Sequence, residues 1–174
     1  MVLPKNSKEE KVFIRLAVTF ITLMKTNCKS ISEIRNLANK AHDERSLFII
    51  DNIICPVYEK YVECMENSQQ KDFTDIILEA TKLCEKWQQS PYEYIIVDEF
   101  QDISMDRYRF LQALRKGEPK AKLFCVGDDW QSIYRFSGSD LSLFTDFENF
   151  FGHKKKKKIE TTYRFGNPLV KLSS

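Results

Sequence analysis

Glycine is scarce in this chain of 174 residues: there are five glycines, and the first of them is Gly117. No G-x-x-x-x-G-K-[ST] sequence occurs anywhere, and the part before Gly117 cannot hold a glycine-rich loop that cradles phosphates. The sequence therefore does not contain a complete nucleotide site of the P-loop type. Proline is equally scarce, at five residues, which argues against linkers and low-complexity segments.

Cysteine, histidine and long apolar runs are also limited. The five cysteines are an odd number without a C-x-x-C pair, and the two histidines have no metal-ligand spacing to them. This argues against a disulfide framework or a zinc site and is typical of reduced thiols in a cytosolic protein. The apolar stretch at residues 12–24 is interrupted by Arg15 and by threonines, and it is too short to span a membrane.

Charge gives only a local signal. Charged residues make up 30% of the chain, but the net charge is +2, so the balance by itself does not predict a nucleic-acid partner. Five consecutive lysines occupy residues 154–158. They could contact phosphates, or they could form a solvated loop before a strand, which is the commoner use of such a run.

Helical patterns fill the first half of the chain. Residues 8–27 carry their polar side chains in one narrow stripe, which predicts a mostly buried helix. A capping-box pattern at Ser30 starts a second helix, and a third pattern over residues 46–67 should kink or split at Pro56. Asp72 can cap a fourth helix. The apolar face expected to be buried on that helix comprises Phe73, Ile76, Ile77, Ala80, Leu83, Cys84 and Trp87.

Strands and helices alternate after Pro91. Residues 94–97 and 123–126 have the apolar character of buried strands, and a helix that begins at Ser104 separates them. This order is typical of a parallel α/β sheet whose strand ends share one edge. Further along, the sequence predicts a helical turn after Asp140, a third strand near residues 158–161 and a last helix from Asn167. We place the boundary between the helical and α/β regions near residue 90.

Two adjacent carboxylates, Asp98 and Glu99, follow directly after the first predicted strand. Because an ionised carboxylate is costly to bury, this strand end must emerge where something neutralises the charges. The carboxyl ends of parallel strands form a ligand crevice, and Mg²⁺ is commonly held there by one or two carboxylates together with substrate phosphates. Asp98 would then hold Mg²⁺, and Glu99 would deprotonate the water that attacks the γ-phosphate of ATP. The alternative is a pair of acidic residues favoured by the dipole of the helix that starts at Ser104.

Two later stretches carry polar and aromatic residues that fit such a site. Gln131 follows the second predicted strand, and its amide could contact a phosphate. Tyr134 and Phe136 flank Arg135, a pattern suited to stacking single-stranded bases at roughly 1–3 kcal/mol per base, although a hairpin with core aromatics has the same spacing. Arg164 could reach the γ-phosphate as an arginine finger, or it could be a surface charge.

Taken together, these stretches resemble the second, third and fourth helicase motifs of the UvrD/Rep family of superfamily one DNA helicases. D-E-F-Q-D at residues 98–102 matches the Walker B box of that family. G-D-D-W-Q-S-I-Y-R-F-S-G at 127–138 and T-T-Y-R-F at 161–165 are especially similar to the bacterial helicase IV branch. D-F-T-D at 72–75 resembles a box that the family carries upstream of its Walker B strand. The resemblance covers residues 72–168 well and the helical first half loosely.

The resemblance implies an ATP-driven translocase and helicase that moves on single-stranded DNA and acts at duplex junctions, in the cytoplasm of a bacterium. Its cofactors would be ATP and Mg²⁺. The residues implied for the nucleotide site are Asp98 and Glu99 for Mg²⁺ and the attacking water, Gln131 and Arg164 for the γ-phosphate, and Gln101 and Asp102 as links to neighbouring motifs. The residues implied for single-stranded DNA are Tyr134, Arg135 and Phe136.

The resemblance also implies a fold: a partial RecA-like (P-loop NTPase) parallel sheet, of class α/β, preceded by an all-helical subdomain. Residues 1–90 would be a helical insertion, and residues 91–174 the C-terminal part of the first RecA-like domain with the start of the second. The chain is then expected to be an internal piece that carries half of an ATP site and is inactive alone. A degenerate, non-catalytic helicase-like scaffold and the helicase part of a helicase–nuclease are the alternatives. Open sheet edges also predict self-association, although the oligomeric state is left open.

Overall fold

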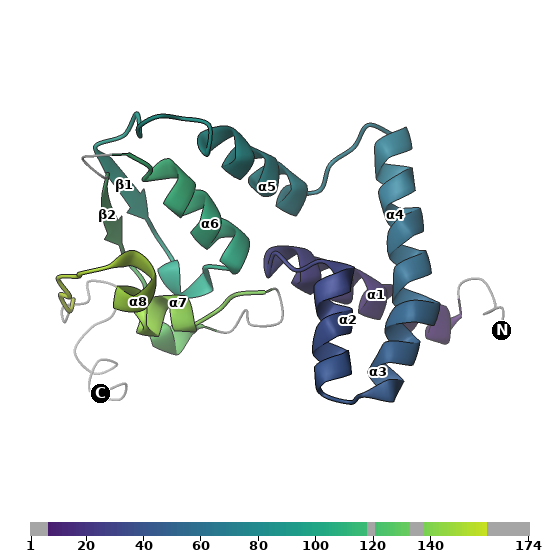
Figure 1. Cartoon of the computed structure of the whole chain (residues 1–174). Helices are drawn as coiled ribbons and strands as arrows, with labels where there is room; N and C mark the ends of the chain where they lie inside the picture. Colours follow the sequence, from purple (N-terminus) through teal and green to yellow (C-terminus); the bar gives the residue numbers. More distant parts are fainter. Residues whose placement is uncertain (1–6, 118–120, 133–137, 160–174) are drawn as a thin grey trace.

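The structure is a computed structural model that describes residues 7–117, 121–132 and 138–159. Its described part is mostly helical, with one small parallel sheet of two strands (Figure 1). The first half comprises α1 (Lys8–Thr26), α2 (Ile31–Lys40), α3 (Glu44–Ile49), the π-helical turn η1 (Ile50–Ile54), α4 (Cys55–Asn67) and α5 (Phe73–Cys84). The second half comprises β1 (Tyr94–Val97), η2 (Phe100–Asp102), α6 (Met105–Leu114), β2 (Lys122–Cys125), η3 (Asp129–Gln131), α7 (Ser142–Thr145) and α8 (Phe147–Phe151).

Most helices of the first half begin where the sequence predicts, while α3 begins at Glu44, two residues before the predicted start, because Asp43 caps it. Ser30 and Glu33 form a reciprocal capping box, with the Glu33 amide 3.2 Å from Ser30 Oγ and the Ser30 amide 2.8 Å from Glu33 Oε2. Pro56 lies in the first turn of α4, directly after the π-helical turn. A missing N–H is best tolerated in a first helical turn, so the helix changes its hydrogen bonding here and continues beyond the proline.

The predicted burial of α1 and α5 is wrong for much of their length. In α1, Val12, Leu16 and Val18 are 49%, 65% and 57% exposed, and Phe73 at the start of α5 is 87% exposed. The buried residues of α1 gather toward its C-terminal end: Ala17, Ile21, Met24, Lys25 and Thr26. The apolar faces exist as the spacing predicts, but the described residues cover only parts of them.

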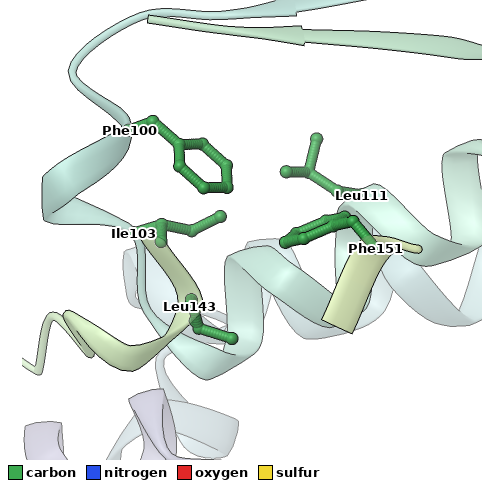
Figure 2. Close-up of a cluster of buried hydrophobic side chains, with 5 residues drawn as sticks. All are labelled: Phe100, Ile103, Leu111, Leu143 and Phe151. Atoms are coloured by element: carbon green, nitrogen blue, oxygen red, sulfur yellow. The ribbon is translucent and has the colours of Figure 1, made fainter. Parts of the chain in front are cut away.

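The two strands pair in parallel, with Tyr94 opposite Lys122 and Val97 opposite Cys125. This confirms the parallel arrangement that the strand–helix–strand order predicts. One face of the sheet packs on a buried apolar cluster whose side chains converge in Figure 2: Phe100, Ile103, Leu111, Leu143 and Phe151. The other face is open, since Ile96 is 74% and Phe124 is 61% exposed.

The elements form two groups in Figure 1, with α1 to α4 at one end and the sheet with α6, α7 and α8 at the other. Helix α5 lies alongside α6, and the C-terminal end of α1 also approaches α6. Residues 158–159 are not in a strand, while residues 160–161 and the predicted last helix lie outside the described part of the chain. No helix among the described residues is long and apolar enough to cross a membrane.

Candidate active site at the carboxyl ends of the strands

Asp98 and Glu99 leave the end of β1 through a sharp turn. Glu99 has a φ of 49° and a ψ of 44°, in the left-handed region, and its amide donates to Asp98 Oδ1 at 2.9 Å. A non-glycine residue there is uncommon and costs on the order of 1 kcal/mol, so its surroundings must hold it. Phe100 supplies this hold, because its ring is buried in the core and its amide donates to Val126 O at 2.9 Å. Both carboxylates are exposed at the carboxyl end of the sheet.

Gln101 joins the ends of the two strands. Its side chain is almost fully buried. Nε2 donates to Glu99 Oε2 at 2.7 Å, and Oε1 accepts the amide of Asp128 at 3.0 Å. A carboxamide can donate and accept at the same time, so one side chain fixes both segments.

Gly127 makes this bridge possible. A Cβ at Gly127 would lie 2.7 Å from Gln101 Oε1 and 3.1 Å from the Gln101 amide nitrogen. At 2.7 Å the carboxamide oxygen would have to shift, and at 3.1 Å the backbone nitrogen would be in tight contact. Glycine at this position therefore allows the segment after β2 to approach the turn at residues 98–101 this closely.

Asp128 extends the connection to Gln131. Its Oδ1 accepts the amide of Trp130 at 3.1 Å, and its Oδ2 accepts Nε2 of Gln131 at 2.8 Å. Gln131 is exposed, and Trp130 is 92% exposed beside it. Glu99, Gln101, Asp128 and Gln131 are thus linked by consecutive hydrogen bonds across the carboxyl edge of the sheet.

A cavity of about 510 Å³ lies beside the carboxylates, between the end of β1 and helices α5 and α6. Its polar wall comprises Asp98, Glu99, Asp102 and Arg107. Asp102 Oδ1 is buried and has no hydrogen-bond partner among the described residues. The exposed carboxylates on this wall, Asp98 and Glu99, suit a cationic group or a hydrogen-bond donor.

The residues present fit Mg²⁺ only in combination with a substrate. No group of three or more His, Cys, Asp or Glu side chains that could hold a metal comes together in residues 7–117, 121–132 and 138–159. Asp98 and Glu99 offer two carboxylates, and other ligands would have to be water or phosphate oxygens. Mg²⁺ is commonly bound in this way in nucleotide enzymes.

Three of the predicted site residues, Asp98, Glu99 and Gln131, lie at the same edge of the sheet. The hydrogen bonds of Gln101 and Asp128 connect them. The others lie outside the described residues: Tyr134, Arg135, Phe136 and Arg164. Sequence reasoning assigned no role to Asp128 or Gly127. The only available signal was the position of G-D-D directly after a predicted strand.

The described fold is a mixed α/β protein that presents an acidic site at the carboxyl edge of a parallel sheet. Residues 5–152 match the UvrD/REP helicase N-terminal domain, and the chain belongs to this family. The resemblance drawn from the motifs is thereby confirmed.

Three relatives illustrate the similarity. DNA helicase IV of Escherichia coli (strain K12) is 36% identical over 171 residues, which cover 95% of this chain and 25% of that protein. ATP-dependent DNA helicase PcrA of Bacillus subtilis (strain 168) is 32% identical over 130 residues, covering 71% of this chain and 17% of that protein. DNA helicase II of Rickettsia typhi (strain ATCC VR-144 / Wilmington) is 32% identical over 127 residues, covering 68% and 18%. The chain thus spans a quarter or less of the length of these proteins.

Proposed function

We propose that this chain is part of an ATP-dependent DNA helicase, which couples ATP hydrolysis to movement on single-stranded DNA and to unwinding at duplex junctions. Family membership supports this proposal, and so do the names of the relatives. The observation that carries it is the placement of Asp98 and Glu99 at the end of β1, linked through Gln101 and Asp128 to Gln131. We further propose that the parent protein works in the bacterial cytoplasm.

The proposed chemistry is phosphoryl transfer to water. Asp98 would bind Mg²⁺, which when bound neutralises charge on the phosphate oxygens. Glu99 would orient the attacking water and accept its proton, as a general base must lie within hydrogen-bond reach of that water. Gln131 would contact the γ-phosphate, and Arg164 would stabilise the charge that develops on it.

The DNA contacts and the domain boundaries belong to the same proposal. Tyr134 and Phe136 would stack on bases, with Arg135 between them. Residues 1–90 would be the helical insertion, and residues 91–174 the C-terminal part of a first RecA-like domain with the start of the second.

ATP turnover by the full-length protein that contains this chain tests the proposal. We expect turnover that requires Mg²⁺ and rises on addition of single-stranded DNA. We expect none from the 174-residue chain alone, because the chain contains no G-x-x-x-x-G-K-[ST] loop to bind phosphates. A folded full-length protein that hydrolyses no ATP would favour the non-catalytic scaffold. Turnover by the 174-residue chain would contradict the assignment of half a site.

A further inference from the structure

Lys25, near the C-terminal end of α1, is a buried ammonium held by two carboxylates. Its Nζ lies 2.6 Å from Asp72 Oδ2 and 2.6 Å from Asp75 Oδ1, and its side chain is only 9% exposed. Both aspartates belong to the D-F-T-D box at the start of α5. A charge this buried is stable only when it is paired, and here it is paired twice.

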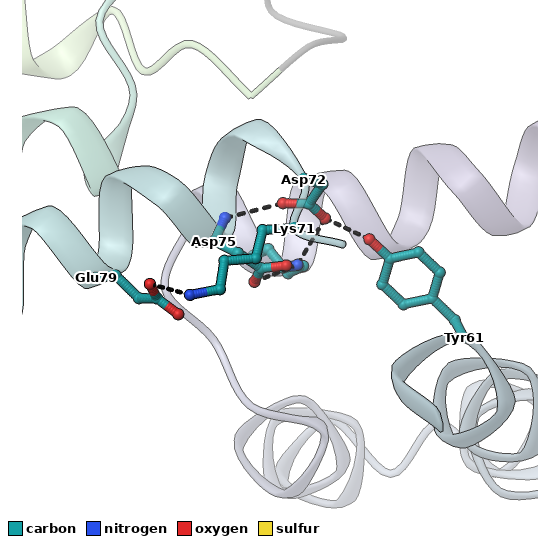
Figure 3. A network of polar contacts seen from close by, with 6 residues as sticks. Tyr61, Lys71, Asp72, Asp75 and Glu79 are labelled. Atoms are coloured by element: carbon teal, nitrogen blue, oxygen red, sulfur yellow. Dashed lines mark hydrogen bonds and ion pairs between the residues drawn. The ribbon is translucent and has the colours of Figure 1, made fainter. Parts of the chain in front are cut away.

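Tyr61 adds a third helix to this cluster, which Figure 3 shows from close by. Its hydroxyl donates to Asp72 Oδ2, and its ring centroid lies 5.4 Å from Lys25 Nζ. Asp72 Oδ1 meanwhile accepts the Asp75 amide at 2.8 Å and so caps α5. One carboxylate therefore receives donors from α1, α4 and its own helix. We call Lys25, Tyr61, Asp72 and Asp75 the lysine cluster.

The residue after Lys25 makes a different contact. Thr26 is 6% exposed and packs against Gly138, where a Cβ would overlap Thr26 Oγ1 and lie 2.9 Å from Thr26 Cβ. Gly138 has a φ of 99°, a value that favours glycine. The end of α1 is thus held by α5 on one side and touches the chain at Gly138 on the other.

The chain at Gly138 is connected to both proposed functions. It directly follows the segment that contains Tyr134 and Phe136. Its next residue, Ser139, forms an antiparallel bridge with Ser104, and the Asp140 amide donates to Ile103 O at 2.8 Å. Ile103 immediately follows η2, the short helix that carries Gln101 and Asp102. A shift of Thr26 would consequently reach both the segment proposed to bind DNA and the turn that carries the catalytic carboxylates.

We propose that Lys25 is a positioning residue: by fixing the end of α1 to the D-F-T-D box, it places Thr26 against Gly138 so that bound DNA can stimulate ATP hydrolysis. This inference rests on the proposed helicase function. It assigns a role to the D-F-T-D box, whose two aspartates hold Lys25.

Lys71 offers a matched control. It directly precedes the box and pairs with Glu79, also seen in Figure 3, but these two side chains are 53% and 50% exposed. Exposed ion pairs contribute little to the stability of a fold. Lys71→Met and Lys25→Met therefore remove the same charge from neighbouring places, and only the second removes a buried cation that two carboxylates share.

The test measures ATP turnover by the full-length protein with increasing single-stranded DNA, for the wild type and for Lys25→Met, Lys25→Arg and Lys71→Met. Three quantities are compared: the unstimulated rate, the maximal stimulated rate and the DNA concentration for half-maximal stimulation. We expect Lys25→Met to lose stimulation, or to need more DNA for it, by about tenfold, while its unstimulated rate stays within about twofold of the wild type. Lys25→Arg should recover most of the stimulation, and Lys71→Met should match the wild type.

An equal fall of the unstimulated and stimulated rates in Lys25→Met, at unchanged half-maximal DNA, would show a merely structural role and overturn the proposal. Unchanged stimulation would also overturn it. Should Lys25→Met fail to fold, Asp75→Asn keeps the pair between Lys25 and Asp72 and should lose part of the stimulation; full stimulation in that variant would contradict the inference. A wild-type protein without DNA-stimulated turnover would instead contradict the proposed function itself.

Discussion

Gln101 determines how the two strand-end segments meet, because its buried carboxamide satisfies a carboxylate on one side and an amide on the other. Glu99 alone would be free to turn into solvent, since its side chain is exposed. The carboxamide limits this freedom and gives the proposed base a defined orientation.

Replacing Gln101 by leucine should therefore destabilise the protein by about 1–3 kcal/mol, because the Asp128 amide and one Glu99 oxygen lose their partner. Gly127→Ala should also destabilise the protein, since the new Cβ would displace the Gln101 carboxamide. Urea and thermal unfolding of the full-length variants measure this. Gln131→Leu is the control, because Gln131 is exposed: its stability should match the wild type. A Gln101→Leu protein as stable as the wild type would show that the bridge contributes nothing.

For single residues, the sequence predicts which side chains are present at the strand ends, but not which hydrogen bonds connect them. Two carboxylates after four apolar residues are a strong local signal for a site at a sheet edge. The hydrogen bond from Asp128 to Gln101 joins residues that are 27 positions apart, and no local pattern specifies it. The same is true of Lys25 and Asp72, which are 47 positions apart.

Helix α5 begins at a charged cap, Asp72. Burial alone would raise the pKa of Asp72, but hydrogen bonds from Lys25, Tyr61 and the Asp75 amide outweigh it and lower the pKa to about 2. Burial, followed by the hydrogen bond to Asp72, raises the pKa of Tyr61 to about 12. The cap and the lysine cluster therefore favour ionised Asp72 beside a protonated tyrosine.

The lowered pKa of Asp72 predicts how the stability of the fold changes in acid. A carboxyl whose folded-state pKa is below its unfolded value stabilises the fold above the unfolded pKa, and this stability is lost as the pH falls. The contribution of Asp72 should be complete above about pH 4 and should disappear toward pH 2, amounting to at most about 2 kcal/mol because the side chain is 32% exposed. Unfolding midpoints measured between pH 5 and pH 2 check this.

Asp72→Asn should reduce the fall of the unfolding midpoint between about pH 4 and pH 2. Glu79→Gln, which removes an exposed partner of Lys71, should leave the pH dependence of the wild type unchanged. An Asp72→Asn protein with the full acid response would contradict the assigned role of the cap.

Helix limits were predictable because caps and prolines are local signals, as at Ser30, Pro56 and Asp72. Burial was not predictable, because it depends on which other elements cover a face. The spacing in α1 gives an apolar face correctly, yet Leu16 remains 65% exposed. The parallel pairing of β1 and β2 followed from the order of strands and helices, whereas a RecA-like fold needs more strands than the two described.

At the scale of the whole molecule, the open apolar faces of the described residues support one interpretation. The outer face of the sheet exposes Ile96 and Phe124, and contiguous apolar surfaces of this kind usually pack against something. A longer helicase would cover such faces and supply the phosphate-binding loop, in keeping with relatives that are at least four times as long as the matched part. Self-association of the isolated chain remains a prediction.

The Glu99→Gln variant of the full-length protein gives the sharpest test of the strand-end site. Glutamine keeps the shape of the side chain and can still meet the Gln101 carboxamide, but it cannot accept the proton of the attacking water. We predict that ATP binding, measured with a fluorescent nucleotide in the presence of Mg²⁺, stays close to the wild-type level. DNA-stimulated turnover should fall by about a thousandfold or more, in the range expected when a general base is removed. Turnover near the wild-type rate would show that Glu99 is not the base, and loss of binding together with turnover would show that Glu99 is structural.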